Sequence, residues 1–169
     1  MSPLLRRTLA PAGQAPVIPT RARHRQKVSV VAALVRSARS GRVRLVHETL
    51  IDRYVDDFLY AEFLKERVIR HARRPLILIQ DNAPLHLGDW TTELIEDSYP
   101  RLRVFQLPPY APELNPVEQL WRWTKHEQLA NFTPLDVGQL AAATDHVIGL
   151  AERDPKRLNA FFGAAKLRW

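Results

Sequence analysis

Apolar and polar positions form distinct patterns along the 169-residue chain, and each pattern predicts an element. Residues 27–35 are an apolar, β-branched run, and residues 43–50 alternate between apolar and polar side chains. The segment Ala-Arg-Ser-Gly-Arg at 38–42 is a turn signal, so these three segments together predict a β-hairpin. Two shorter apolar runs, at 75–80 and 102–107, predict two further strands.

Five segments carry the features of helices. Residues 52–73 lack Gly and Pro, and their apolar side chains recur near helical spacing. Helices are also predicted over residues 90–99, 116–131 and 136–153, with a short final helix within 154–167. Strands followed by helices along one chain favour an α/β layer structure.

Positive charge is concentrated at the amino end of the chain. The formal net charge is +7, and ten Lys and Arg residues precede Glu48, the first acidic residue. Residues 1–26 lack periodicity and are rich in Pro, Arg and Ala, which predicts an extended basic arm. The asymmetry suggests contact with phosphate groups. A solubilising surface, or an arm packed on an acidic partner, explains the same charges.

Composition excludes several classes of protein. The chain contains no cysteine, so disulfides and thiolate metal sites are excluded. No apolar run approaches the roughly 18 residues of a membrane span, and the amino end is too rich in proline for a signal-peptide core. We therefore expect a cytoplasmic protein without a membrane partner; association with the nucleoid is expected only from the family resemblance described below.

The first candidate for chemistry is Asp81, which directly follows the predicted strand at 75–80. Open α/β sheets commonly bind ligands at the carboxyl ends of their strands, where this carboxylate is expected. Asp81 and Asn82 also form a good turn pair, so a purely structural Asp81 is the simpler interpretation of this segment alone.

The second candidate is Glu118, in the segment Leu-Pro-Pro-Tyr-Ala-Pro-Glu-Leu-Asn-Pro-Val-Glu-Gln-Leu-Trp at 107–121. Asn115 and Pro116 suit the N-cap and first position of a helix, which places Glu118 in its first turn. An acid there interacts favourably with the helix dipole, and it is also placed to project into a cleft at the strand ends. Two carboxylates on one rim would suit Mg²⁺ or Mn²⁺ and metal-dependent phosphodiester chemistry.

Two motifs together resemble a known family. The segments Leu-Ile-Gln-Asp-Asn-Ala-Pro-Leu-His at 78–86 and 107–121 resemble the second and third acidic motifs of insertion-sequence transposases related to mariner elements. The segment at 4–18 resembles the stretch that follows the first acidic motif of that family. The resemblance implies a ribonuclease H-like α/β fold, a mixed sheet with flanking helices, and DDE-type, metal-dependent cleavage and transfer of DNA strands.

The resemblance also assigns roles to individual residues. Asp81 and Glu118 match the second and third catalytic acids and would bind Mg²⁺ or Mn²⁺, while Asn82, His86 and Asn115 match flanking positions that support the site. His86 has an equally good interpretation as an ordinary loop histidine. The implied organisation is a basic arm at 1–26, a catalytic domain at 27–135 and a helical segment at 136–169.

One element of the family pattern has no counterpart in the sequence. The family requires a first Asp on the central strand, and neither Glu48 nor Asp52 has a geometric reason to replace it. We therefore expect the first, central strand to be missing and the chain to be inactive alone. A truncated gene, a misplaced start codon or an upstream-encoded transposase half that supplies this strand would each explain the departure.

The expected partner is DNA, both transposon ends and target, with a homo-oligomer also expected. Phosphate contacts are predicted for the basic residues Arg21, Arg23, Arg25, Lys27, Arg122 and Lys125. Trp121 is expected in the core, and Trp123 either in the core or facing DNA. The alternatives are a non-catalytic nucleic-acid-binding remnant of a transposase and, less well supported because no Gly-rich phosphate loop is present, an unrelated Mg²⁺-dependent phosphotransferase.

Overall fold

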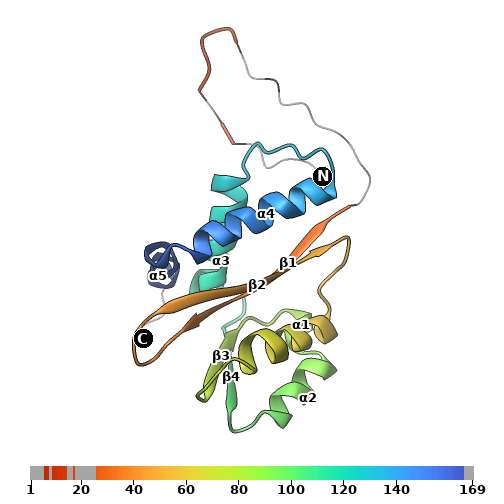
Figure 1. The fold of residues 1–169 in the computed structure, drawn as a ribbon, viewed down its shortest axis with the longest axis vertical. Helices are drawn as coiled ribbons and strands as arrows, with labels where there is room; N and C mark the ends of the chain where they lie inside the picture. The colour runs from red at the N-terminus through yellow and green to blue at the C-terminus, as the bar shows by residue number, and fades with distance from the viewer. Residues whose placement is uncertain (1–5, 8, 15–16, 18–25, 166–169) are drawn as a thin grey trace.

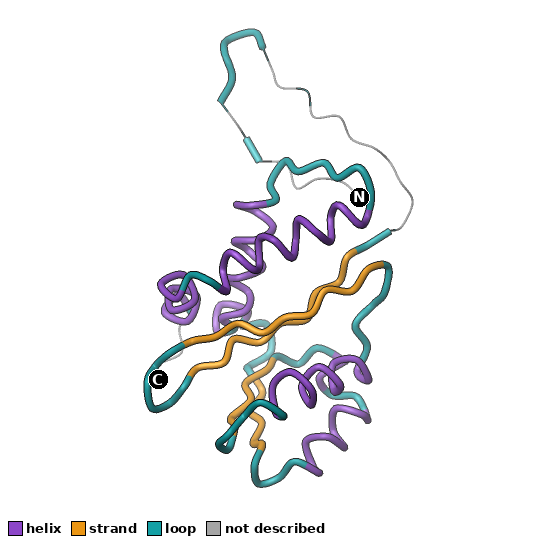
Figure 2. Tube along the Cα trace, viewed as in Figure 1, coloured by secondary structure: helices purple, strands orange, loops and turns teal. Residues whose placement is uncertain are grey.

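The computed structural model describes residues 6–7, 9–14, 17 and 26–165, and within them four strands form two separate sheets (Figures 1 and 2). The predicted hairpin is confirmed: β1 (Val28–Arg36) pairs antiparallel with β2 (Val43–Ile51). The two short apolar runs are also strands, since β3 (Leu76–Gln80) pairs parallel with β4 (Leu102–Gln106).

Helices connect and cover these strands. Two of them continue into a π-helical turn, in which the hydrogen bonds span one residue more than in an α-helix. The helical elements are α1 (Asp57–Phe63) with its π-helical turn Leu64–Ile69, α2 (Asp89–Asp97), α3 (Pro116–Arg122) with its π-helical turn Trp123–Gln128, α4 (Val137–Glu152) and α5 (Pro155–Ala164).

The β1–β2 sheet lies between two layers, as Figure 1 shows. Alternate residues of each strand point to opposite faces. In this hairpin other elements cover both faces. One face packs on α3, α4 and α5 through a core that includes Leu120, Ile148 and Leu158. The other face packs on α1 and β3, around Phe63 and Leu64. The core on the α3, α4 and α5 side includes helices that lie nearly one hundred residues later in the chain. The hairpin therefore depends on these distant helices for its packing.

The described strands form two separate pairs rather than one continuous sheet. No hydrogen-bond ladder joins the pairs, so within the described residues each of the four strands has one edge without a neighbouring strand. Unpaired strand edges expose backbone N–H and C=O groups that an additional strand can satisfy. The absence of a first strand and the domain boundaries at residues 26 and 135 stay predictions.

Side chains that cap helices fix where the later elements begin. The predicted cap at Asn115 is confirmed, because its side-chain oxygen accepts a hydrogen bond from the Val117 N–H at 3.1 Å.

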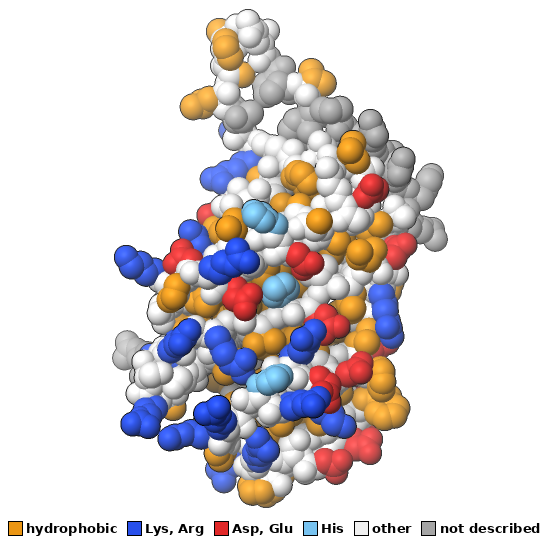
Figure 3. Space-filling model, viewed as in Figure 1, with side chains coloured by type: hydrophobic (Ala, Val, Ile, Leu, Met, Phe, Trp, Pro, Cys, Tyr) orange, Lys and Arg blue, Asp and Glu red, His pale blue; other side chains and the backbone are white. Residues whose placement is uncertain are grey.

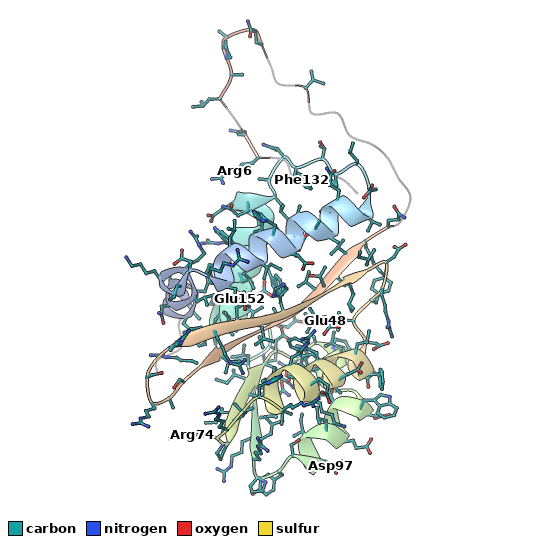
Figure 4. The ribbon with its side chains drawn as sticks, in the orientation of Figure 1. Arg6, Glu48, Arg74, Asp97, Phe132 and Glu152 are labelled. Carbon is teal, nitrogen blue, oxygen red and sulfur yellow. The ribbon has the colours of Figure 1, made fainter. Side chains whose placement is uncertain are left out.

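Near the amino end, the Arg6 N–H donates to the Asn131 side chain at 2.8 Å, and Figure 4 shows Arg6 close to Phe132. None of the helices among the described residues has the length and apolar character needed to cross a membrane.

Candidate metal site at the carboxyl ends of β3 and β4

Two parallel strands bring the loops that carry the sequence motifs to one edge. Gln80 and Gln106, the last residues of β3 and β4, are register partners, and the Leu107 N–H donates to the Gln80 carbonyl at 2.8 Å. Asp81 therefore leaves β3 at the same edge from which residues 107–115 leave β4. This is the edge where the sequence predicted a ligand site.

Asp81 is held by one of its carboxylate oxygens. Oδ1 accepts a hydrogen bond from the Ala83 N–H at 3.1 Å and lies 2.8 Å from His86 Nδ1. Oδ2 makes no hydrogen bond with any residue that the structure describes, and the side chain is 44% exposed. Asp81 thus caps the turn, as the structural interpretation predicted, and still presents an oxygen to a ligand.

A chain of buried polar groups connects this loop to α1. The hydroxyl of Tyr60 donates to Gln80 Oε1 at 2.8 Å, and Gln80 Nε2 donates to the His86 carbonyl at 3.1 Å. The His86 ring lies against the Tyr60 ring with centroids 4.3 Å apart. Burial, and then the negative charge of Asp81, raise the pKa of the Tyr60 hydroxyl, so it remains a proton donor at neutral pH.

Side chains of the neighbouring strand complete this support. The Gln106 amide, oriented with its nitrogen toward the backbone carbonyls, donates to Asp81 at 3.0 Å and to Gln80 at 3.2 Å. Asn82 Nδ2 donates to the Leu107 carbonyl at 2.8 Å. The loop after β3 is therefore bonded to β4 on both sides of Asp81.

Glu118 lies in the first turn of α3, where the Asn115 cap fixes the start of the helix. Its N–H donates to the Asn115 carbonyl at 3.0 Å. Its carboxylate is half-buried and makes no hydrogen bond or ion pair with a described residue. The Glu118 carboxylate can therefore interact with the helix dipole and still be available to a ligand.

The structure brings some of the predicted site residues together and leaves others apart. Asp81 and His86 are in direct contact, whereas no hydrogen bond joins either of them to Glu118. Within the described part of the chain, no three His, Asp or Glu side chains gather into a cluster able to hold a metal ion. Sharing of one ion by Asp81 and Glu118 stays a prediction.

The structure describes three of the six predicted DNA-binding residues. Arg21, Arg23 and Arg25 lie outside the described residues. The ammonium group of Lys27 lies over the ring of Tyr54, while the remaining two, Arg122 and Lys125, are exposed on α3 and its π-helical turn. Their contacts with DNA stay predictions.

Sequence reasoning missed the supporting residues Tyr60, Gln80 and Gln106. A usable signal was present, because each of two apolar strands ends in glutamine. A buried glutamine such as Gln80, which is 3% exposed, needs hydrogen-bond partners, and the exposed Gln106 at the matching strand end supplies one. Tyr60 carried no such signal, since its position fits the apolar face of the α1 helix.

The chain resembles known proteins in both sequence and fold. Residues 2–140 match the family described as DDE superfamily endonuclease. Among solved structures, the Mos1 strand transfer complex aligns with a TM-score of 0.61 and 16% identity, covering 96% of this chain and 47% of that one. The Mos1 mariner paired end complex with Mn aligns with the same TM-score and identity, covering 96% and 48%.

These alignments concern only part of the Mos1 chains, because this chain spans about half of their length. At such low identity they show a shared fold, a mixed α/β arrangement of the ribonuclease H-like type. No curated protein matches the sequence significantly.

Proposed function

The chain belongs to the DDE superfamily of endonucleases, and we propose that it is the catalytic region of an insertion-sequence transposase that cleaves and transfers DNA strands. The observation that carries the proposal is the pair of carboxylates on the two sequence motifs. Asp81 Oδ2 and the Glu118 carboxylate make no hydrogen bond to described residues. One follows β3, and the other follows the loop that leaves β4 at the same edge.

Asp81 and Glu118 are the residues that would hold a divalent ion. Mg²⁺ and Mn²⁺ prefer oxygen ligands, and both carboxylates have oxygens available. When bound, such an ion lowers the pKa of an attacking water or hydroxyl and stabilises the leaving oxygen of a phosphodiester. His86 and Asn82 keep the Asp81 loop in place, and Asn115 fixes the helix turn that presents Glu118.

Two carboxylates leave much of the coordination of two metal ions unfilled, since Mg²⁺ requires near-octahedral geometry. Each of the four described strands has one open edge, and such edges would accept an additional strand between the two sheets. We infer that this strand brings a further acid to the end of the β3–β4 sheet where Asp81 lies. The 169 residues by themselves would then cleave DNA poorly.

DNA is the partner that the family relationship supports. The Mos1 structures are a strand transfer complex and a paired end complex. Here, the exposed Arg122 and Lys125 lie on the same helical segment as Glu118, so they would contact phosphates beside the reacting strand. Such contacts weaken with salt and do not read sequence.

Nicking of supercoiled plasmid in Mn²⁺ tests the proposal. The chain is assayed alone and together with the sequence encoded immediately upstream of its Met1 codon. We expect the combined protein to nick at least about 10-fold faster than the chain alone. We also expect Asp81→Asn or Glu118→Gln to lower its rate by about 100-fold or more, the equivalent of several kcal/mol.

The matched controls are Asp89→Asn and Glu93→Gln on α2, which remove the same charges from exposed positions. These controls should leave nicking unchanged. Nicking that survives both Asp81→Asn and Glu118→Gln would exclude the proposed mechanism.

The alternative is a non-catalytic protein that binds nucleic acid. One observation favours it: His86 Nδ1 lies 2.8 Å from Asp81 Oδ1 and would compete with a cation for this carboxylate oxygen. In that case DNA binding persists unchanged in Asp81→Asn and Glu118→Gln, and no combination of chain and upstream sequence nicks the plasmid.

A further inference from the structure

Basic side chains gather at the end of the β3–β4 sheet opposite to Asp81. Residues 65–74 contain five Lys and Arg residues and a single acid, Glu66. Two more arginines begin β4. We define the basic end as the exposed residues Arg73, Arg74, Arg101 and Arg103.

The parallel pairing of β3 and β4 places these four arginines at one end. Arg73 and Arg74 precede Pro75 and β3, Arg101 directly precedes β4, and Arg103 is the register partner of Ile77. Figure 3 shows Lys and Arg side chains spread over this lower left part of the molecule, while acidic ones gather at the lower right. Figure 4 shows Arg74 and Asp97 on these two opposite sides.

Backbone contacts hold the basic end in place. The Arg101 guanidinium donates to the Ala72 carbonyl, and the Leu76 N–H donates to the Arg101 carbonyl at 2.8 Å. The loop between α1 and β3 is thereby attached to the start of β4. The arginines are thus presented from an ordered edge, which lowers the entropy cost of binding a ligand.

A role in stabilising the fold explains Arg101, which bonds the Ala72 carbonyl, and other basic residues nearby, but not Arg73, Arg74 or Arg103. Arg70 pairs with Glu66 at 2.7 Å near the carboxyl end of its helix, where a cation also favours the helix dipole. Arg67 lies 3.5 Å from Glu48. By contrast, no residue of the basic end forms an ion pair with any residue that the structure describes.

We propose that the basic end binds the phosphate backbone of duplex DNA, at a surface separate from the site of cleavage. Guanidinium groups match phosphate oxygens in charge and geometry. The five residues of β3 separate this surface from Asp81 by about 17 Å, at roughly 3.3 Å per residue. It therefore contacts either a distant flank of the cleaved duplex or a second duplex. The choice of DNA rests on the proposed function.

Fluorescence anisotropy with a labelled duplex of arbitrary sequence tests the proposal. We compare the double variant Arg73→Ala/Arg74→Ala with Arg153→Ala/Lys156→Ala, which removes the same charge from exposed positions around the α4–α5 junction. We expect the first variant to bind about 10-fold more weakly at 100 mM salt. Its slope of log affinity against log salt should fall in magnitude by about 1.8, at roughly 0.9 per lost phosphate contact.

Binding stoichiometry distinguishes the two sources of phosphate, because roughly 17 Å corresponds to only about 5 base pairs of duplex. A second duplex bound at the basic end predicts two 15-base-pair duplexes per chain at saturation, falling to one in Arg73→Ala/Arg74→Ala. A flank of one duplex predicts one duplex per chain in both proteins. Equal losses in the two double variants, or no loss in Arg73→Ala/Arg74→Ala, would overturn the proposal.

The outcome of this DNA-binding experiment can be interpreted separately from the proposal that Asp81 and Glu118 are catalytic. Asp89→Asn on α2, which belongs to neither proposed surface, should leave this binding unchanged. If nicking is insensitive to Asp81→Asn while the basic-end variant still loses DNA, the catalytic proposal fails and this one stands.

Discussion

Removing one hydroxyl, in Tyr60→Phe, tests how strongly the buried network supports the candidate metal site. Tyr60 is 6% exposed, Gln80 is 3% exposed, and the Tyr60 hydroxyl is the donor to Gln80 Oε1. Phenylalanine fills the same space but leaves this buried oxygen without its donor. An unsatisfied buried polar group costs about 1–3 kcal/mol. For a chain of this length, that corresponds to a decrease in Tm of about 2–12 °C.

Thermal and urea unfolding followed by circular dichroism measure this loss. The control is Tyr110→Phe, because Tyr110 is fully exposed and its hydroxyl makes no hydrogen bond with a described residue. Changes at such surface positions stay within about 0.5 kcal/mol. Equal stability of Tyr60→Phe and Tyr110→Phe would refute the view that the Tyr60–Gln80 bond holds the loop.

The same hydroxyl predicts a dependence on pH. Burial, and then the charge of Asp81, raise the pKa of Tyr60 above its ordinary value of 10.0. In the unfolded chain the hydroxyl ionises near pH 10, whereas in the folded chain it keeps its proton. The stabilisation is therefore complete below pH 10 and declines as pH rises toward the folded-state pKa, by up to about 1.4 kcal/mol per pH unit. Tyr60→Phe should remove this component of the slope between pH 10 and 11.

Three other substitutions test packing and local geometry. Leu120→Ala removes a fully buried side chain from the core against β1 and β2, and urea unfolding should register a loss of about 2–5 kcal/mol. Gly88→Ala places a methyl group 2.5 Å from Asp57 Cβ, which rotation of the Asp57 side chain does not move, so we expect about 1–3 kcal/mol of destabilisation by the same assay, and unchanged stability would contradict this close approach. Asp136→Ala removes the α4 cap, whose carboxylate accepts from the Gln139 N–H at 2.7 Å, and should lower Tm by the equivalent of about 1 kcal/mol.

Periodicity and turn chemistry predicted most of the fold. Each predicted strand is present, because alternation and β-branched runs directly reflect which faces become buried. The helix predicted over 52–73 is shorter, since Asp56 caps α1 and Asp52 adopts a positive φ of 56° that no helix allows. The π-helical turns left no trace in the pattern, because one shifted hydrogen bond hardly changes apolar spacing over six residues.

Packing within the α3 segment differed from the prediction. Trp121, expected in the core, is only half-buried at its margin. Trp123 is buried, 6.2 Å from the Phe161 ring, with the Arg157 guanidinium over its other side. Two tryptophans at this spacing face different directions, and the position of α5 decides which of them is enclosed. Spacing alone gives no information about that tertiary contact.

The sequence predicted the residues of the candidate site from two motifs. It did not predict the hydrogen-bond network that supports them. The turn at Asp81 and the cap at Asn115 follow from local chemistry, so the sequence was sufficient for both. The bonds from Tyr60 and Gln106 depend on which elements become neighbours, which no local pattern specifies. The supporting network therefore required the structure, although the two acids did not.

The account depends on Asp81 and Glu118 binding the same ion, and calorimetric titration with Mn²⁺ tests this most directly. Wild type, Asp81→Asn, Glu118→Gln and the double variant are compared. Each single variant should lose at least the roughly 10-fold in affinity that even a residue outside the coordination shell contributes. The double variant should lose less than the sum of the two single losses, because side chains that share one ligand are coupled by about 0.5–3 kcal/mol. Independent, additive losses, or unchanged binding in either single variant, would contradict a shared site.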